Sequence, residues 1–85
     1  MTEVDVTERA LRVISEILNR KASEISLDAS LRNDLLVDSL QRMTLFIVLE
    51  DEFQRTIPLE EVAELDTINE IISLISHKLR QKSGA

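Results

Sequence analysis

Apolar residues recur every three or four positions in two stretches of this chain, and this spacing constrains the fold more than any other feature. The first set is Leu11, Ile14, Ile17 and Leu18, and the second is Ile68, Ile71, Ile72, Ile75 and Leu79. Because an α-helix has about 3.6 residues per turn, each set lies along one side of a helix. Both stretches are therefore predicted to be amphipathic helices that bury these sides in one core.

Polar residues indicate where the two helices begin. Asp5 is placed to cap the first helix, and Glu8, three residues later, completes a capping box. Thr67 and Glu70 have the same relation at the start of the last helix. Each pair can satisfy backbone N–H groups that the first turn of a helix leaves without partners. The two helices are therefore expected to start at these residues.

The stretch between the two helices contains a third helix and a long loop. Helical spacing extends over residues 39–53, and Pro58 is expected to open a short helical piece through Leu65. Residues 21–37 lack this periodicity but keep four apolar residues at intervals, which are Ile25, Leu27, Leu31 and Leu35. These side chains are expected to pin an ordered loop to the core, and long ordered loops are usually functional.

The composition favours a single all-α domain over residues 1–85, with structure from about residue 5 to 80 and a frayed tail at 81–85. One glycine and one proline leave few positions at which helices would break. The chain has no cysteine, which fits the reducing cytoplasm. The acidic N-terminus does not resemble a signal peptide, and no apolar run approaches the roughly 20 residues of a membrane span. Stable membrane insertion is therefore not expected.

The net charge of −6 comes from one segment. Residues 50–66 contain seven acidic residues and one basic residue, whereas acids and bases nearly balance in the chain before them. An acidic surface of this density repels nucleic acid phosphates and attracts basic protein surfaces. The segment therefore indicates either a surface for a protein partner or a solubilising surface, and it argues against nucleic-acid binding.

Ser39 is one of eight serines, and its position separates it from the others. Asp38 is a preferred N-cap residue, and Gln41, three residues later, completes a capping box, so Ser39 lies on the first turn of its helix. Backbone N–H groups and the positive end of the helix dipole favour an anion there, by about 0.3–1 kcal/mol at an exposed position. A phosphodiester on the Ser39 hydroxyl would suit this position. A serine that merely assists capping, the role expected of Ser30, is the simpler alternative.

The helix at 39–53 carries apolar residues on two sides. The core-facing side is expected to hold Leu45, Phe46, Leu49 and Phe53. The other side holds Leu40, Met43 and Ile47 together with Glu50, Asp51 and Gln54. Because charged side chains are rarely buried without partners, we interpret this second side as an exposed docking strip that begins beside Ser39. A helix that its neighbours enclose on all sides is the alternative.

The chain resembles the acyl carrier proteins over residues 8–80. The resemblance rests on the run DLLVDSLQRMTLFIVLEDEFQRTIP, with its Asp-Ser-Leu motif and acidic Asp-Glu-Phe end, and on the capped DTINEIISLI that follows. It implies a four-helix bundle with a long loop between helices 1 and 2 and a short helix 3. It also implies that a phosphopantetheinyl transferase attaches 4′-phosphopantetheine to Ser39, with Asp38 as the N-cap beside it.

In such a carrier, the cofactor thiol holds an acyl group as a thioester, which accounts for a chain without cysteine. Such a protein is not an enzyme, and it is expected to be a monomer. It could also shelter the acyl chain among aliphatic core residues. It presents the acyl group to acyl-transferring and acyl-modifying enzymes of fatty acid, lipid or polyketide biosynthesis. The implied partner-binding residues are Leu40, Met43, Ile47, Glu50 and Asp51.

Two departures from the family favour a specialised member. Carriers of fatty acid synthesis commonly have glycine where this chain has Leu36, and acids on the exposed side of helix 2 where it has Gln41, Arg42 and Thr44. Fewer acids and an added arginine should weaken docking to basic patches. A D-alanyl or other aminoacyl carrier is one alternative, although such carriers usually have glycine at the place of Gln41. An unmodified acidic helical module that binds a protein partner is an alternative of another class.

No catalytic or metal-binding group of residues competes with these interpretations. The only histidine, His77, lies late in the last helix without a nucleophile near it in the sequence, and it is expected at the surface. The acid pairs Asp51-Glu52 and Glu60-Glu61 lack the spacing of a dedicated cation site.

Overall fold

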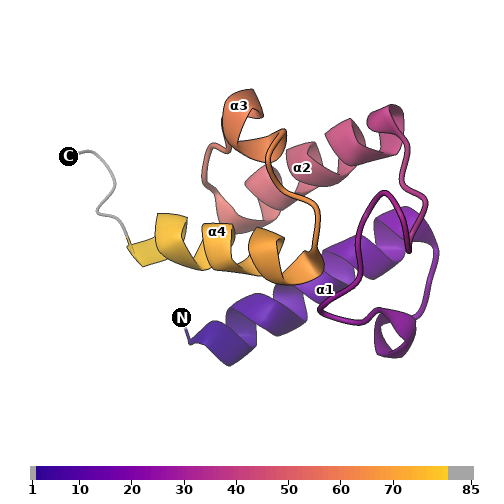
Figure 1. Ribbon diagram of the computed structural model, residues 1–85. Helices are drawn as coiled ribbons and strands as arrows, with labels where there is room; N and C mark the ends of the chain where they lie inside the picture. Colours follow the sequence, from indigo (N-terminus) through magenta and orange to yellow (C-terminus); the bar gives the residue numbers. More distant parts are fainter. Residues whose placement is uncertain (1, 81–85) are drawn as a thin grey trace.

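The computed structural model describes residues 2–80, which form an all-α bundle (Figure 1). Its helices are α1 at Glu3–Leu18, α2 at Ser39–Phe53, α3 at Leu59–Val62 and α4 at Ile68–Arg80, and a short 3-10 helix, η1, covers Ala22–Glu24. The prediction of a four-helix bundle with a long first loop and a short third helix is confirmed. The tail expected at 81–85 lies outside the described residues. Between residues 2 and 80, no helix combines the length and the apolar character that a membrane crossing requires.

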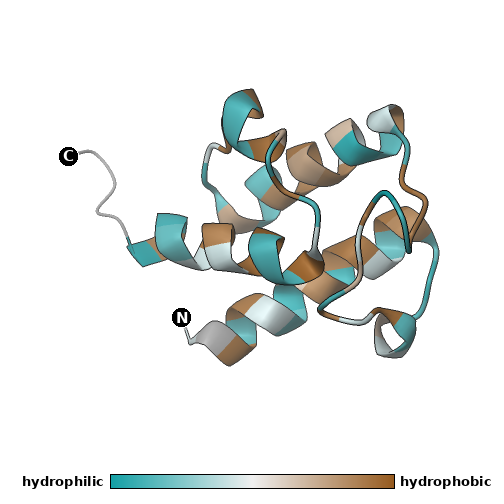
Figure 2. Cartoon of the chain, in the orientation of Figure 1, coloured by the Kyte–Doolittle hydropathy of each residue, from teal (hydrophilic) through white to brown (hydrophobic). Residues whose placement is uncertain are grey.

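One hydrophobic core lies between the helices. Its largest fully buried side chains are Ile14, Leu31, Leu45, Leu49, Ile68, Ile71 and Ile75. In Figure 2, hydrophobic and hydrophilic ribbon alternate along α1 and α4, as expected for helices that bury only one side. The stripe predicted for α4 is confirmed, with Leu79 partly buried at its end.

The start of α1 differs from the prediction. Thr2 is the N-cap residue, and Asp5 is the third helical residue of a capping box. Thr2 Oγ1 accepts a hydrogen bond from the Asp5 amide at 3.2 Å, and the Asp5 carboxylate accepts one from the Thr2 amide at 3.3 Å. The predicted pair of Asp5 and Glu8 is therefore wrong, because the Thr2 hydroxyl offers the same reciprocal cap three residues earlier. Val6, in the first turns of α1, is buried in the core.

The loop between α1 and α2 is ordered because its backbone binds the segment that leads into α4. The Leu31 amide donates to the Asp66 carbonyl at 2.7 Å, and the Asn69 amide donates to the Leu27 carbonyl at 2.8 Å. The Ser30 hydroxyl donates to the Asp66 carboxylate at 2.6 Å. Ser30 is therefore a link between the loop and α4 as well as a local capping residue.

Three of the four apolar residues predicted to pin this loop do so. Ile25, Leu31 and Leu35 are buried, whereas the Leu27 side chain is 38% exposed. The prediction for Leu27 is wrong because its carbonyl, and not its side chain, attaches the loop to α4. The capping box predicted at the start of α4 is confirmed, since Thr67 Oγ1 accepts from the Glu70 amide and the Glu70 carboxylate accepts from the Thr67 amide.

Two carboxylates at the loop–α4 junction stabilise the fold in their ionised form. The hydrogen bond from the Ser30 hydroxyl lowers the pKa of Asp66 below its ordinary value of 3.8. The backbone amides of Thr67 and Asp66 lower the pKa of Glu70 below its ordinary value of 4.5. At pH values between the folded and the ordinary pKa, the unfolded chain binds more protons than the folded chain. The stabilisation is therefore complete above the ordinary values and is lost as the pH falls through the folded values.

We expect the free energy of unfolding to fall with acidification below about pH 4.5, and to fall less in the Asp66→Asn, Glu70→Gln double variant. The variant keeps the shape of both side chains but removes their titration. Urea unfolding curves at a series of pH values would measure the difference. Parallel pH profiles for the natural chain and the variant would contradict the assignment of these two groups.

Candidate functional site

Ser39 is the first residue of α2 and lies where the long loop enters that helix (Figure 1). The N-cap residue Asp38 accepts a hydrogen bond from the Gln41 amide at 2.7 Å, and the Gln41 side chain accepts one from the Asp38 amide at 3.4 Å. The predicted capping box is therefore confirmed. Because Asp38 and Gln41 form the cap, Ser39 is held at the helix start without its own side chain taking part.

The Ser39 side chain is exposed, and within residues 2–80 its hydroxyl makes no hydrogen bond. The amides of Ser39 and Leu40 belong to the first turn of α2, where intrahelical carbonyl partners are lacking. These amides and the helix dipole favour a negative group on the hydroxyl. The site therefore fits a phosphodiester-linked group, because its hydroxyl is accessible and the charge added to it is stabilised.

Five large apolar side chains are exposed on the segment before α2, on α2 itself and on α3. Their exposed fractions are 73% for Leu36, 74% for Leu40, 55% for Met43, 60% for Ile47 and 73% for Leu59. The predicted exposure of the strip on α2 is confirmed, and so is its core side, which buries Leu45, Phe46, Leu49 and Phe53. An α2 enclosed on all sides is therefore excluded. Leu59 was missed because a helix of four residues is too short for periodicity to distinguish its sides.

Two charged residues of α2 have different surroundings from those that the sequence predicts. Arg42 is half-buried, and its guanidinium donates to the Val62 carbonyl at 2.7 Å and to the Leu65 carbonyl. Glu50 is also half-buried and accepts a hydrogen bond from the Ile57 amide at 2.6 Å. The Arg42 guanidinium is therefore held against the backbone at the end of α3, and its effect on docking stays a prediction. Asp51 is the exposed acid at that end of α2.

The family model described as Phosphopantetheine attachment site matches residues 8–75. The chain is 35% identical to the acyl carrier protein of Petrotoga mobilis over 79 residues, which cover 93% of each chain. It is 37% identical to the acyl carrier protein of Exiguobacterium sibiricum over 75 residues, covering 88% of this chain and 95% of the relative. The corresponding protein of Porphyromonas gingivalis is 33% identical over 76 residues, covering 89% and 97%. The chain belongs to the acyl carrier protein family.

As an acyl carrier protein, the chain carries acyl groups on 4′-phosphopantetheine and is not itself an enzyme. It works with enzymes that handle the acyl group. The resemblance, the function and the cofactor predicted from the sequence are confirmed. The comparisons do not favour an aminoacyl carrier or an unmodified interaction module.

Leu36 departs from the residue type that its backbone conformation favours. Its backbone is left-handed, with φ 54°, and glycine is the residue that adopts this conformation without steric cost. Within the described chain, the other non-glycine residues with positive φ are Asn19 and Gln54, and both are helix C-caps. The left-handed conformation costs a residue with a side chain about 1–2 kcal/mol. The Leu36 side chain is mostly exposed, so its burial does little to offset this cost.

We expect Leu36→Gly to raise the free energy of unfolding by about 0.5–1 kcal/mol, after allowing for the freedom that glycine adds to the unfolded chain. Thermal unfolding would detect this gain as a melting temperature higher by about 2–8 °C. Asn19→Gly is the matched control, and it should change stability less because asparagine tolerates the left-handed region. A less stable Leu36→Gly variant would show that the leucine side chain stabilises the fold by more than its backbone conformation costs.

The acidic segment at 50–66 is partly neutralised within the fold. Glu52 accepts from Arg9 at 2.8 Å and from Arg12 at 3.0 Å, and Glu61 pairs with Lys78 at 2.9 Å.

No group of three or more histidine, cysteine or acidic side chains that could hold a metal ion occurs among residues 2–80. His77 is exposed on α4, as predicted.

A pocket of about 140 Å³ lies between α2 and α3. It is lined by Arg42, Met43, Phe46, Ile47, Glu50, Ile57, Leu59 and Val62. Most of these side chains are apolar, and Met43 and Ile47 of the exposed strip form part of the wall of this small recess.

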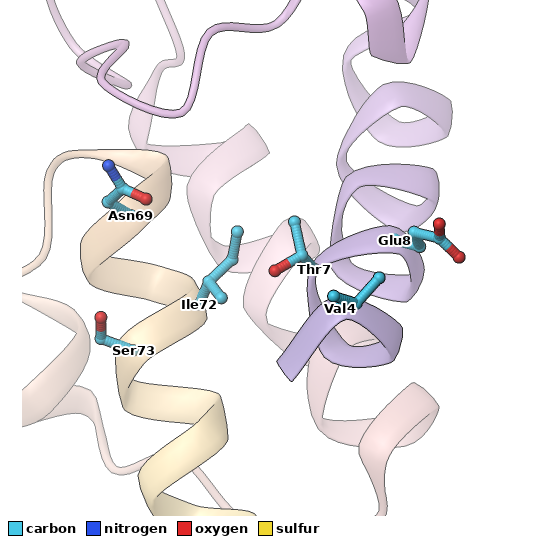
Figure 3. A pocket seen from close by; sticks show the side chains of 6 residues that line it. All are labelled: Val4, Thr7, Glu8, Asn69, Ile72 and Ser73. Carbon is cyan, nitrogen blue, oxygen red and sulfur yellow. The ribbon is translucent and has the colours of Figure 1, made fainter. Parts of the chain in front are cut away.

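A wider groove of about 510 Å³ lies between α1 and α4 (Figure 3). The figure shows Ile72 of α4 and Thr7 of α1 pointing toward one another across it. The start of α1 and the start of α2 lie at opposite ends of the molecule (Figure 1). This groove is therefore separate from the Ser39 site.

Proposed function

We propose that Ser39 is the residue to which 4′-phosphopantetheine is attached, and that a phosphopantetheinyl transferase attaches it. The observation that carries the proposal is an exposed serine on the first turn of α2, held there by the capping box of Asp38 and Gln41. Ser30 and Ser76, by contrast, are buried and cannot reach a transferase without local unfolding.

In the attachment, the 4′-phosphopantetheine group is transferred from coenzyme A to the Ser39 hydroxyl in one step. The Ser39 oxygen forms a bond to the phosphorus that bears the pantetheine group, and the pyrophosphate bond of coenzyme A breaks. Adenosine 3′,5′-bisphosphate leaves, and the hydroxyl proton passes to a base of the transferase. The product is a phosphodiester with one negative charge, which the first-turn amides of α2 stabilise. The thiol at the other end of the arm carries the acyl group as a thioester.

The exposed strip of α2 is the surface through which the carrier meets its enzymes. Leu40, Met43 and Ile47 offer apolar contacts beside Ser39, and Asp51 adds a negative charge. Glu50 lies at the same end, although its carboxylate also holds the Ile57 amide. Apolar contacts supply binding energy, while the acids raise the rate of encounter with basic surfaces. The partners are the transferase and acyl-transferring or acyl-modifying enzymes of fatty acid, lipid or polyketide biosynthesis, which meet a monomeric carrier in the cytoplasm.

The purified chain should gain the mass of one phosphopantetheine group when it is incubated with coenzyme A and a transferase of broad specificity. Intact-mass spectrometry measures the gain, and fragmentation of the peptide that contains Ser39 locates it. A chain that stays unmodified while another carrier is modified in the same tube would contradict the proposal. Modification at a residue other than Ser39 would contradict the assignment of the site.

A further inference from the structure

The helix α3 depends on polar contacts from its neighbours. It has four residues, and of these only Val62 is buried. A helix this short is not stable through its own hydrogen bonds. Two cations from flanking helices hold it: Arg42 of α2 binds its C-terminal end, and Lys78 of α4 pairs with Glu61 at 2.9 Å.

Arg42 makes the link between α3 and α2. Its Nη2 atom donates to the carbonyl of Val62, the last residue of α3, and to the carbonyl of Leu65 beyond it. The Val62 carbonyl also accepts a hydrogen bond from the Leu65 amide at 3.1 Å, and carbonyls at a helix end carry partial negative charge, so a cation suits this place. The guanidinium also lies over the ring of Phe46, 5.9 Å from its centre. Breaking the link would leave these carbonyls without their cation.

Arg42 is at the same time part of the wall of the pocket between α2 and α3. Arg42 and Met43 follow Ser39 by three and four residues, so all three lie on one side of α2. A group attached to Ser39 is therefore on the side of the helix where the pocket lies. The pocket is lined largely by aliphatic side chains, which suits a hydrocarbon chain. Its volume of about 140 Å³ is close to that of an apolar cavity of about 150 Å³ that holds benzene, a molecule of about six carbon atoms.

We propose that Arg42 determines the size of the acyl group that this carrier shelters, by keeping α3 closed against α2. The inference rests on the proposed attachment at Ser39. With Arg42 bound to the Val62 and Leu65 carbonyls, the pocket holds a short aliphatic group. A longer chain needs Leu59 and Val62 to move away from α2, and this movement breaks both hydrogen bonds of Arg42.

Hydrogen exchange on the unmodified protein tests the first part of this proposal. Arg42→Met keeps an unbranched side chain beside Phe46 but removes the donors, and Arg20→Met removes one exposed charge at the end of α1 as the matched control. We expect the backbone amides of Val62, Ala63 and Leu65 to exchange about 10- to 100-fold faster in Arg42→Met than in the natural chain. The amides of α4 in this variant, and the amides of Val62, Ala63 and Leu65 in Arg20→Met, should exchange at their natural rates. Unchanged exchange in α3 would overturn the proposal.

Loading with acyl groups of different length tests the second part. The transferase would load Ser39 from butanoyl, hexanoyl and dodecanoyl coenzyme A, and thermal unfolding would be compared with the unacylated form, because a sheltered chain stabilises the folded state. We expect the natural chain to be stabilised by the two short groups and little by dodecanoyl, and Arg42→Met to be stabilised by dodecanoyl as well. The same length profile in both proteins would overturn the proposal. Failure to load Ser39 would refute the proposed function, whereas the exchange experiment would still decide whether Arg42 holds α3.

Discussion

Ser39→Ala should abolish the gain of phosphopantetheine mass and leave the free energy of unfolding within about 0.5 kcal/mol of the natural value. The hydroxyl is exposed and makes no hydrogen bond in the described part of the chain, and Asp38 supplies the helix cap. Alanine is a good helix former, so the first turn of α2 stays intact. Intact mass after incubation with the transferase measures the first effect, and urea unfolding measures the second.

The matched control for this experiment is Ser73→Ala, which removes an exposed serine of α4. This variant should take up the cofactor at the natural rate. A Ser39→Ala chain that still gains the cofactor would place the site at another residue. A Ser39→Ala chain that unfolds would show that the hydroxyl has a structural role that the capping box does not account for.

Leu49→Ala should destabilise the carrier by about 2–5 kcal/mol, whereas Ile47→Ala, two residues earlier, should cost less than about 1 kcal/mol. Leu49 is 0% exposed, and Ile47 is 60% exposed. A small domain has a total stability of about 5–15 kcal/mol, so the Leu49 variant should be largely unfolded at temperatures where the natural chain is folded. Thermal unfolding, monitored by circular dichroism, compares the melting temperatures of the two variants.

The Ile47 variant also tests the docking strip. It should slow the transfer of phosphopantetheine to Ser39, chiefly through a higher KM, because the mutation removes contact area and not a reacting group. Natural kinetics in a folded Ile47→Ala protein would contradict the role of the strip toward the transferase. A loss of stability as large as that of Leu49→Ala would mean that the side chain packs inside the fold.

The helices of this carrier could be predicted because their signals are local. Asp38 and Gln41 cap α2 at three-residue spacing, and the apolar repeat of α4 spans its whole length. The start of α1 was misplaced because two overlapping pairs with the same spacing compete, and the pair formed by Thr2 and Asp5 makes the cap.

The position of Ser39 at the start of α2 was also a local signal, but its surroundings were not. Arg42 contacts carbonyls 20 and 23 residues away in the sequence, and no periodicity predicts which carbonyl a guanidinium reaches. The exposure of Leu59 depends on the direction in which a four-residue helix is attached. The left-handed backbone of Leu36 has no signal in a leucine, and the sequence analysis did not predict it.

The hydrogen bonds between the long loop and the junction with α4 have a consequence for the time at which the carrier becomes active during its synthesis. The loop leads into Ser39, yet its bonding partners lie 36 residues further along the chain for Ser30 and 41 for Asp28, which pairs with Asn69. Such distant contacts form only after the intervening chain has been made and brought back. The loop that leads into Ser39 can therefore be ordered only after the residues up to Asn69 have been made and have folded back. Under the proposed attachment at Ser39, the transferase would meet the serine in its folded surroundings only on a completed bundle.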